Sequence, residues 1–572
     1  MKIPLVSKTM IRVISLFITA LILSSCSFYD TEKGDYATYT IDPAEPTEGD
    51  SDMEIYDGPC FFDDKNIADF KIVYGECSNK TLLNAAKDLA DYLNKAYSSE
   101  IPYIQAEDFD GTAENIIFIG STSYDTDKVR SSCEGLYNNG LAIVCDGSNL
   151  YLTGENETGA VYAVYTFLED YIGWRFYSSS CERLIKQERI NLPVDADITY
   201  SPKLFNRDTY WLDSFDPHFA AKLKINGGIS RNSRQYGQMI RYAGDFVHSL
   251  PGLAGTSREP NVQPCLTDPA VYEKVLKKVR STLKSNPNAT IISVSQNDSY
   301  ADGLGCQCEN CRAIDEREGT PMGSLLTFVN KIADAIKDEY PNVYVDTLAY
   351  RYTRKAPKTI KPADNVIIRL CSIECCFSHD LDSDCPQNEE FKKDIEDWAK
   401  ISKNLFVWDY TTDFLYYIIP FPNLKVLYDN VRFFVDHNVT GIFEQGNSQS
   451  VSGEFGELRA YMLAKIMWNP DMSERQYERI MDDFLEGYYG AGWQYIKEYI
   501  NKTSELSAGS HMGIYDSVKQ NLSLEGKDIL GVIGELEALW RSALEAADEE
   551  HYANVERSSL QIRCAKLLLL WD

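Results

Sequence analysis

Basic residues are scarce in this chain relative to acidic ones. The 572 residues include 56 Lys and Arg against 86 Asp and Glu, which gives a formal net charge of −30. A surface this acidic repels phosphate backbones and anionic lipid. We therefore expect no nucleic-acid partner.

Several motifs of cofactor and nucleophile chemistry are also missing. The sequence contains no P-loop, no G-x-S-x-G, no H-E-x-x-H and no dinucleotide-binding fingerprint. Phosphoryl transfer and hydride transfer therefore have no support, and we expect no cofactor. Histidine is rare, with six in the whole chain.

Long apolar runs are absent beyond the N-terminus. Lys2, Lys8 and Arg12 precede the run "VISLFITALIL", which is too short to span a bilayer comfortably and ends in "LSSC" at Cys26. This ending resembles a bacterial lipobox, in which the chain is cut before the cysteine and the thiol is acylated. We predict a lipoprotein signal peptide over residues 1–25, lipidation of Cys26, and export to the cell envelope. The lipid anchor would hold the protein on the periplasmic side or on the outer-membrane surface.

The rest of the chain divides into four predicted parts, which are residues 26–60, 61–198, 199–455 and 456–572. Residues 26–60 are acidic and poor in large aliphatic side chains, which predicts a flexible tether. Strands alternate with helices over residues 61–198, and this predicts an α/β sandwich domain with one sheet and helices packed against it. Residues 456–572 show apolar residues at i, i+3 and i+4, which predicts a helical C-terminal region.

Residues 199–455 contain a rhythm of strand, loop and helix that predicts a central (β/α)8 TIM-like barrel. The predicted strand cores are "LFNRDTYW", "KINGGIS", "GDFVHSL", "ATIISVSQND", "VYVDTLAYR", "NVIIRLCSIE", "NLFVWDYTTD" and "VTGIFEQG". The fold class is therefore α/β.

Carboxylates follow four of these predicted strands. Asp298 follows the fourth, Glu374 the sixth, Asp409 the seventh and Glu444 the eighth. In a TIM barrel the active site lies at the carboxyl ends of the strands, and glycosidic cleavage needs one acid and a second carboxylate. We predict these four residues as the catalytic group, with Asp298 as the general acid. In the alternative interpretation, such residues only cap the following helices.

Polar and aromatic side chains near the same predicted strand ends are candidate substrate contacts. These residues are Asn297, Tyr210, Trp211, His248, Trp408 and Tyr410. Aromatic side chains offer a flat apolar face for a sugar ring, and Tyr adds a hydrogen-bonding tip. A lone histidine such as His248 is also typical of a purely structural position.

The cysteines allow three interpretations. Of the 15, Cys26 is set aside for acylation, and the even remainder favours disulfides in an exported protein. The segment "CQCENC" places Cys306, Cys308 and Cys311 at a spacing compatible with three zinc ligands, and Cys265 could supply the fourth. Disulfides, a structural zinc and free thiols all stay open, and each role would be structural, at the loop after Asp298.

Several segments resemble known families. "TGAVYAVYTFLEDYIGWRFYS" resembles the end of the N-terminal α/β domain of α-glucuronidases and β-hexosaminidases. "SVSQNDSYADGLGCQCENC", "RLCSIECCFSHDL" and "LAKIMWNPDMSERQYERIMDDFLEGYYG" resemble the domain-of-unknown-function family 4838, which is common among exported bacterial lipoproteins tied to glycan use.

The resemblance implies a glycosidase-like barrel with a general acid after the fourth strand, at Asp298, and a base at Glu374 or Asp409. The chain has Asp where the α-glucuronidase pattern has Glu. It also lacks the adjacent Asp-Glu pair that β-hexosaminidases place after the fourth strand.

Together these features predict an exported, lipid-anchored glycoside hydrolase that cleaves O-glycosyl bonds in a complex oligo- or polysaccharide. The alternative is a catalytically inactive, glycan-binding lipoprotein on the same barrel. The two differ in whether the strand-end carboxylates turn substrate over.

Overall fold

The computed structural model describes residues 56–76, 80–227, 234–237, 240–300, 303–451 and 453–571. The predicted signal peptide, Cys26 and most of the predicted tether lie outside these residues. Within the described ranges, every helix is too short or too polar to cross a bilayer.

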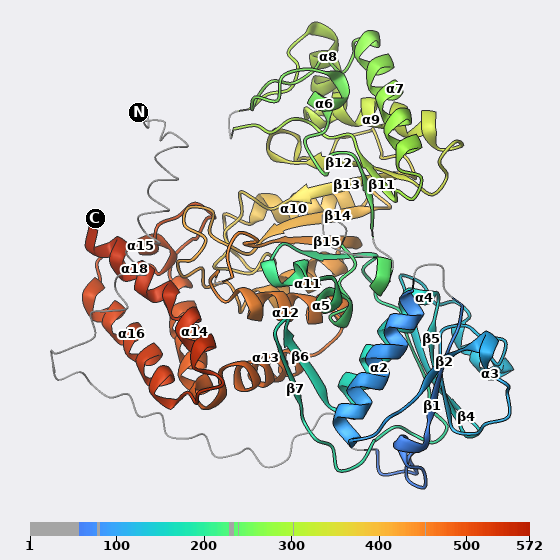
Figure 1. Cartoon of the computed structure of the whole chain (residues 1–572). Helices are drawn as coiled ribbons and strands as arrows, with labels where there is room; N and C mark the ends of the chain where they lie inside the picture. Colours follow the sequence, from blue (N-terminus) through green and yellow to red (C-terminus); the bar gives the residue numbers. More distant parts are fainter. Residues whose placement is uncertain are drawn as a thin grey trace. The chain divides into compact units, whose positions relative to one another are not determined.

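The first sheet is mixed and has six strands in the order β2-β1-β3-β5-β4-β8. Its strands are β1 (Lys71–Tyr74), β2 (Tyr103–Gln105), β3 (Ile116–Ile119), β4 (Leu141–Asp146), β5 (Asn149–Gly154) and β8 (Asp197–Tyr200). Helices α2 (Thr81–Tyr97) and α4 (Glu157–Phe167) pack on one face, and α3 (Asp127–Cys133) packs on the other (Figure 1). The predicted arrangement of one sheet with packed helices is confirmed for this part. A hairpin of β6 (Trp174–Ser178) and β7 (Cys181–Leu184) follows.

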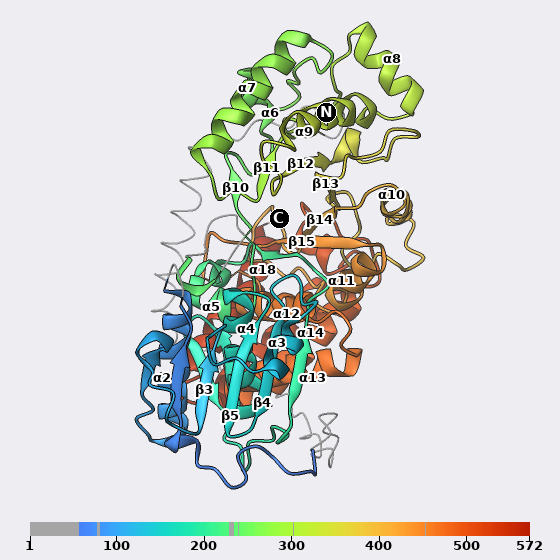
Figure 2. The ribbon, with the colours of Figure 1, turned by 90° about the vertical axis from the view of Figure 1, so that its right-hand side faces the viewer.

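The second sheet is parallel throughout and has the strand order β10-β11-β12-β13-β14-β15-β9. Its strands are β9 (Asn206–Thr209), β10 (Tyr242–Ala243), β11 (Ile291–Ser293), β12 (Tyr344–Ala349), β13 (Val366–Cys371), β14 (Leu405–Tyr410) and β15 (Val439–Gln445). Figure 2 shows β10 to β15 following one another across this sheet. These strands form a curled, parallel half-barrel. The described residues do not show the closed barrel of eight strands that the sequence predicts.

The predicted strand over "GDFVHSL" is wrong. Strand β10 ends at Ala243, and Gly244 then turns the chain with a φ of 79°. Pro251 sits in the first turn of the short helix α6 (Leu250–Ala254), where its ring favours helix initiation. His248 therefore lies in a loop at the carboxyl end of β10.

The gap between β9 and β10 is bridged in part by one residue, Asn226. Its backbone N–H donates to the Arg207 carbonyl at 3.1 Å, and its own carbonyl accepts from Ile240 N–H at 3.1 Å. The Asn226 side chain adds bonds to the Arg207 N–H at 2.9 Å and to the Phe205 carbonyl at 2.8 Å. Asn226 lies in the predicted strand "KINGGIS", which extends beyond the described residues.

Helices follow most strands of the half-barrel. They are α5 (Pro217–Lys222), α7 (Pro269–Ser285), α8 (Glu309–Glu318), α9 (Met322–Ile336), α10 (Glu389–Ala399), α11 (Leu427–Asp436) and α12 (Gly456–Trp468). The C-terminal region is helical, as predicted, with α13 (Glu474–Tyr489), α14 (Trp493–Ser507), α15 (Val518–Asn521), α16 (Ile529–Ala546), α17 (Tyr552–Ser558) and α18 (Leu560–Trp571). Ser473 and Gln476 form a capping box at the start of α13, and Gly490 ends it.

Candidate active site

Neighbouring side chains on β14 and β15 point to opposite faces of the sheet. Trp408 pairs in register with Phe443, and their rings meet edge to face at 5.0 Å on the concave side, the lumen of the half-barrel. Asp409 and Glu444 come next on each strand and pair with each other. Because side chains alternate along a strand, these two carboxylates lie on the outer face, away from the lumen.

Both carboxyl groups of the outer-face pair are buried, and the pKa of each is raised. Asp409 and Glu444 are 2% and 1% exposed. Ser372 donates a hydrogen bond to Asp409, whereas neither carboxylate oxygen of Glu444 has a hydrogen-bond partner among the described residues. Burial raises the pKa of Asp409 to about 6. Burial, with the nearby Asp409 charge, raises the pKa of Glu444 well above its ordinary value.

Asp298, in contrast, is accessible at the carboxyl end of β11, and 51% of its side chain is exposed. Its Oδ1 accepts the Ser299 N–H at 2.8 Å and the Tyr350 hydroxyl at 3.2 Å. Arg351 Nε donates to the Tyr350 oxygen at 2.8 Å, so the Tyr350 proton is free to be donated to Asp298. Burial raises the pKa of Tyr350, which keeps it a donor. Oδ1 is thus occupied, and Oδ2 is the oxygen left for proton transfer.

His248 lies beside Asp298. Its Nδ1 is 2.9 Å from the Gln296 carbonyl, which can only accept, so Nδ1 carries a hydrogen. Its Nε2 is 4.0 Å from Asp298 Oδ1. Both His248 and Arg351 have a φ of 52°, in the left-handed region that side chains other than glycine rarely adopt. Such backbone strain is concentrated at functional sites in proteins.

Glu374 follows β13 and is held by an arginine. Arg354 NH1 is 2.7 Å from a Glu374 oxygen, and the same guanidinium contacts Asp394 at 2.7 Å. The Glu374 side chain is still 36% exposed. Arg351 interacts electrostatically with both Tyr350 and Glu374. Strand ends therefore bring Asp298, His248 and Glu374 into one neighbourhood.

Aromatic rings line the lumen beside these groups. Trp408 stacks with Tyr410 at 6.1 Å and an interplanar angle of 16°, and Phe443 connects Trp408 to Tyr210 with centroid distances of 5.0 and 5.8 Å. Trp408 is half-buried, and its indole N–H has no hydrogen-bond partner among the described residues. The predicted contacts Tyr210, Trp408 and Tyr410 are thus brought together, although Tyr410 is buried, with 4% of its surface exposed.

Two other predicted contacts are turned away. Trp211 is 1% exposed, and its indole N–H donates to Thr411 Oγ1 at 3.0 Å. The Asn297 amide donates to the carbonyls of Glu259 at 2.7 Å and Val262 at 3.2 Å, which ties it to a neighbouring loop. A ring without exposed surface cannot stack on a sugar, and an amide already bonded to a loop positions that loop.

The sequence analysis missed several residues that build the site. Tyr350 and Arg351 follow β12 in "LAYR", where a polar aromatic and a charge at a strand end were the available signal. At the floor of the lumen, Arg369 and Asp346 form a fully buried ion pair at 2.8 Å. Tyr515, from the loop before α15, interacts electrostatically with Arg351 and Asp298. Its place in the site depends on the C-terminal region packing there.

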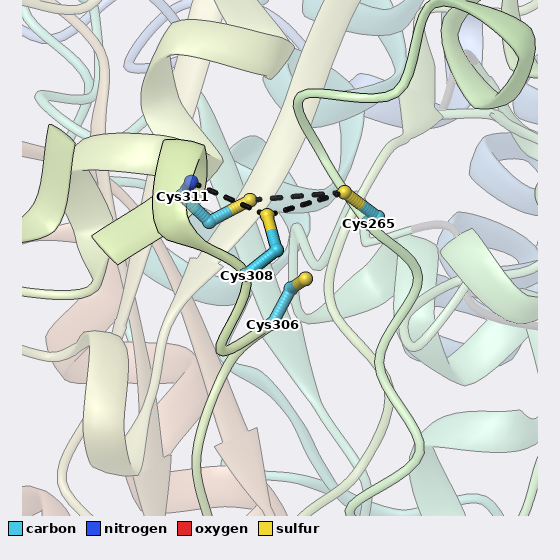
Figure 3. A group of neighbouring side chains, drawn as sticks. All are labelled: Cys265, Cys306, Cys308 and Cys311. Atoms are coloured by element: carbon cyan, nitrogen blue, oxygen red, sulfur yellow. Dashed lines mark hydrogen bonds between the residues drawn. The ribbon is translucent and has the colours of Figure 1, made fainter. Parts of the chain in front are cut away.

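The cysteine cluster after β11 is shown in Figure 3. Cys265, Cys306, Cys308 and Cys311 place their sulfurs within 4.8 Å of one another, and Cys265 Sγ is 3.7 Å from Cys308 Sγ and 4.0 Å from Cys311 Sγ. The described cysteines are all free thiols. Four thiolates around a tetrahedral zinc, at about 2.3 Å each, stand about 3.8 Å apart, whereas a disulfide needs about 2.05 Å. This donor set fits a structural zinc.

Comparison with known proteins identifies the class of fold. The structure is similar to a family GH115 4-O-methyl-α-glucuronidase with specificity for decorated arabinogalactans, with a TM-score of 0.55 and 10% identity over 87% of this chain and 71% of that one. It also matches a GH138 enzyme targeting the pectin rhamnogalacturonan II (TM-score 0.45, 10% identity, 87% of this chain and 68% of that one). A third match is the GH20 β-N-acetylhexosaminidase from Streptomyces coelicolor A3(2) (TM-score 0.43, 12% identity, 74% and 92%). The likeness to the GH115 enzyme shows that the chain has a fold found in glycoside hydrolases.

The family is defined by sequence. Residues 176–501 match the family described as a domain of unknown function, DUF4838, and the chain belongs to it. The resemblance read from the sequence is thereby confirmed. No curated protein matches the chain.

Proposed function

We propose that the protein hydrolyses a glycosidic bond in a complex glycan at the carboxyl ends of β11 to β14. The observation that carries this proposal is the Asp298 carboxylate, which is accessible on the lumen side with one oxygen held by Tyr350 and the other free. The glycoside-hydrolase fold supports the placement, because active sites of such barrels lie at the carboxyl ends of their strands.

Proton transfer to the leaving oxygen is assigned to Asp298 Oδ2. His248 Nε2 lies 4.0 Å from Asp298 Oδ1, beyond hydrogen-bond distance, so His248 is a neighbour of the acid. Glu374 is the second carboxylate. Arg354 NH1 positions it at 2.7 Å, and its assigned role is attack on the anomeric carbon or activation of water. Trp408 supplies a ring face for the sugar.

A matched pair of variants tests this assignment. Turnover is measured by chromatography of released sugars on a panel of arabinogalactans, pectins and N-acetylhexosamine glycans. Asp298→Asn is expected to abolish release, since the amide keeps the hydrogen bonds to Tyr350 but cannot carry the proton. Asp409→Asn makes the same change on the outer face and is expected to retain release. Equal activity of Asp298→Asn and the wild-type chain would overturn the proposal.

Glycan binding without turnover is the second candidate function. The observation that favours it is the engagement of Glu374 by Arg354, which also pairs with Asp394. If this contact persists with glycan bound, the second carboxylate is not free to act. Glycan-array binding by the wild-type chain, lost in Trp408→Ala and accompanied by no sugar release, would select this function.

Export and lipid anchoring are part of the same proposal. They are supported by the charged N-terminus, the short apolar run and the "LSSC" ending. Labelling of cells with a palmitate analogue is expected to mark the wild-type protein in the membrane fraction and to leave Cys26→Ser unmarked. Labelling of both would contradict acylation at Cys26.

A further inference from the structure

A second group of side chains of metal-ligating types, separate from the four-cysteine cluster, lies farther along the chain. Cys376, His379 and Cys385 stand between β13 and α10, and His511 stands between α14 and α15. One donor atom from each lies within 4.8 Å of the other three. The four donors thus come from two regions of the chain that are remote in sequence.

The distances match those of a tetrahedral metal site. Cys376 Sγ is 3.3 Å from His379 Nδ1, and Cys385 Sγ is 3.5 Å from His511 Nδ1. With zinc about 2.3 Å from sulfur and about 2.0 Å from nitrogen, tetrahedral geometry places the two donors about 3.5 Å apart. Cys376 and Cys385 are both free, with exposures of 1% and 7%.

The surroundings orient one imidazole as a ligand. His379 Nε2 is 3.1 Å from the Ala508 carbonyl, which only accepts hydrogen bonds. Nε2 therefore carries the hydrogen, and the Nδ1 lone pair faces Cys376. Ligating histidines in metalloproteins commonly donate their second N–H to such an outer partner. The rings of His379 and His511 stand 5.5 Å apart at 75°, so both can direct Nδ1 to a common point.

We propose that Cys376, His379, Cys385 and His511 bind a zinc ion that joins the loop after β13 to the C-terminal helical region. Each cysteine loses its proton on binding, and the histidines bind as neutral imidazoles. Backbone contacts run beside the site, with Phe377 N–H donating to the Met512 carbonyl at 2.8 Å. The ion would hold the Glu374 loop against the segment that carries Tyr515. This proposal does not depend on glycosidase activity.

The four-cysteine cluster carries the same inference independently. Its sulfur separations of 3.7 and 4.0 Å suit a tetrahedral set of four thiolates. The backbone N–H of Cys311 also points to Cys308 Sγ at 3.4 Å, a contact that stabilises a thiolate. We therefore expect two zinc ions per chain, one after β11 and one after β13.

Metal analysis of the full chain tests both sites. The chain is purified in detergent from zinc-supplemented cells, passed over gel filtration, and analysed for zinc by mass spectrometry. Two zinc ions per chain are expected in the wild-type protein and in the control Cys564→Ser. One is expected in His511→Ala and in Cys308→Ser. His511→Cys restores a ligand and is expected to keep both.

X-ray absorption at the zinc edge separates loss of a ligand from loss of folding. The wild-type chain is expected to show about three sulfurs and one nitrogen per zinc, averaged over the two sites. Cys308→Ser retains only the mixed site and is expected to show about two of each. Two zinc ions per chain in His511→Ala would overturn the proposal. A disulfide between Cys376 and Cys385, detected by intact mass in zinc-replete protein, would also overturn it.

Discussion

The two faces of the parallel sheet carry carboxylates with opposite properties. On the lumen side and at the strand ends, Asp298 and Glu374 are accessible and engaged by Tyr350 and Arg354. On the outer face, Asp409 and Glu444 are buried side by side, and Glu444 lacks any hydrogen-bond partner within the described residues. Asp298 and Glu374 lie in the loops that follow β11 and β13, whereas Asp409 and Glu444 lie within β14 and β15, where side-chain alternation turns them to the outer face.

Among single variants, the loss of kcat expected for Glu374→Gln is second only to that of Asp298→Asn. The amide keeps a hydrogen bond to Arg354 but removes the charge, so kcat should fall by about 10²- to 10³-fold. Glu444→Gln makes the same change on the outer face and should leave kcat within about twofold. Steady-state kinetics on the glycan found in the screen measures both. A loss of turnover in Glu444→Gln alone, with Glu374→Gln active, would contradict the roles assigned to the two faces of the sheet.

Tyr350→Phe removes the donor that holds Asp298 Oδ1 while keeping the ring. We expect kcat to fall by roughly tenfold, since a hydrogen bond to a charged group contributes about 1.5–3 kcal/mol. Binding of glycan, measured by calorimetry, should change little. A variant with unaltered kcat would show that the Arg351–Tyr350–Asp298 chain of hydrogen bonds has no part in turnover.

Trp408→Ala removes the half-buried ring at the lumen. Loss of stacking should weaken glycan binding by about tenfold, or about 1.4 kcal/mol. Trp211→Ala is the contrasting change, because Trp211 is fully buried, and it should lower the Tm instead. Calorimetry and thermal unfolding of both variants separate the two roles. Weaker binding in Trp211→Ala at unchanged Tm would contradict the assignment.

The smallest predicted effect concerns pH and stability. Burial raises the pKa of Glu457 on α12 from 4.5 to about 7. The folded chain therefore keeps a proton that the unfolded chain releases, and stability from this group falls as pH rises from about 4.5 to about 7. Glu457→Gln removes this dependence, so its Tm should rise relative to the wild-type chain between those pH values. A constant difference in Tm across the range would contradict the shift.

The sequence predicted most strands of the half-barrel but not the faces of their side chains. Strands β11 to β15 are near-continuous apolar runs, as expected for parallel strands covered on both faces. Such runs reveal where a strand ends, which identified Asp298 and Glu374. They do not show which of Trp408 and Asp409 points inward, because the apolar run does not distinguish the two faces and the pairing with β15 is needed to place them.

Other parts of the site depend on distant segments. His511 lies 126 residues from Cys385, so no local spacing indicates that they meet. The "CQCENC" spacing, in contrast, was compatible with three zinc ligands as well as with disulfides or free thiols, and the sequence already offered Cys265 as a fourth ligand. Asn226 bridges β9 and the segment before β10 through single hydrogen bonds, which no hydrophobic pattern could indicate.

A crystal structure of Asp298→Asn with a bound glycan tests the central claim most directly. The account predicts a sugar ring against Trp408 on the lumen side, with its glycosidic oxygen within hydrogen-bond distance of the residue 298 side chain. A glycan bound elsewhere, with the Trp408 ring and the carboxyl ends of β11 and β13 free of sugar, would contradict it.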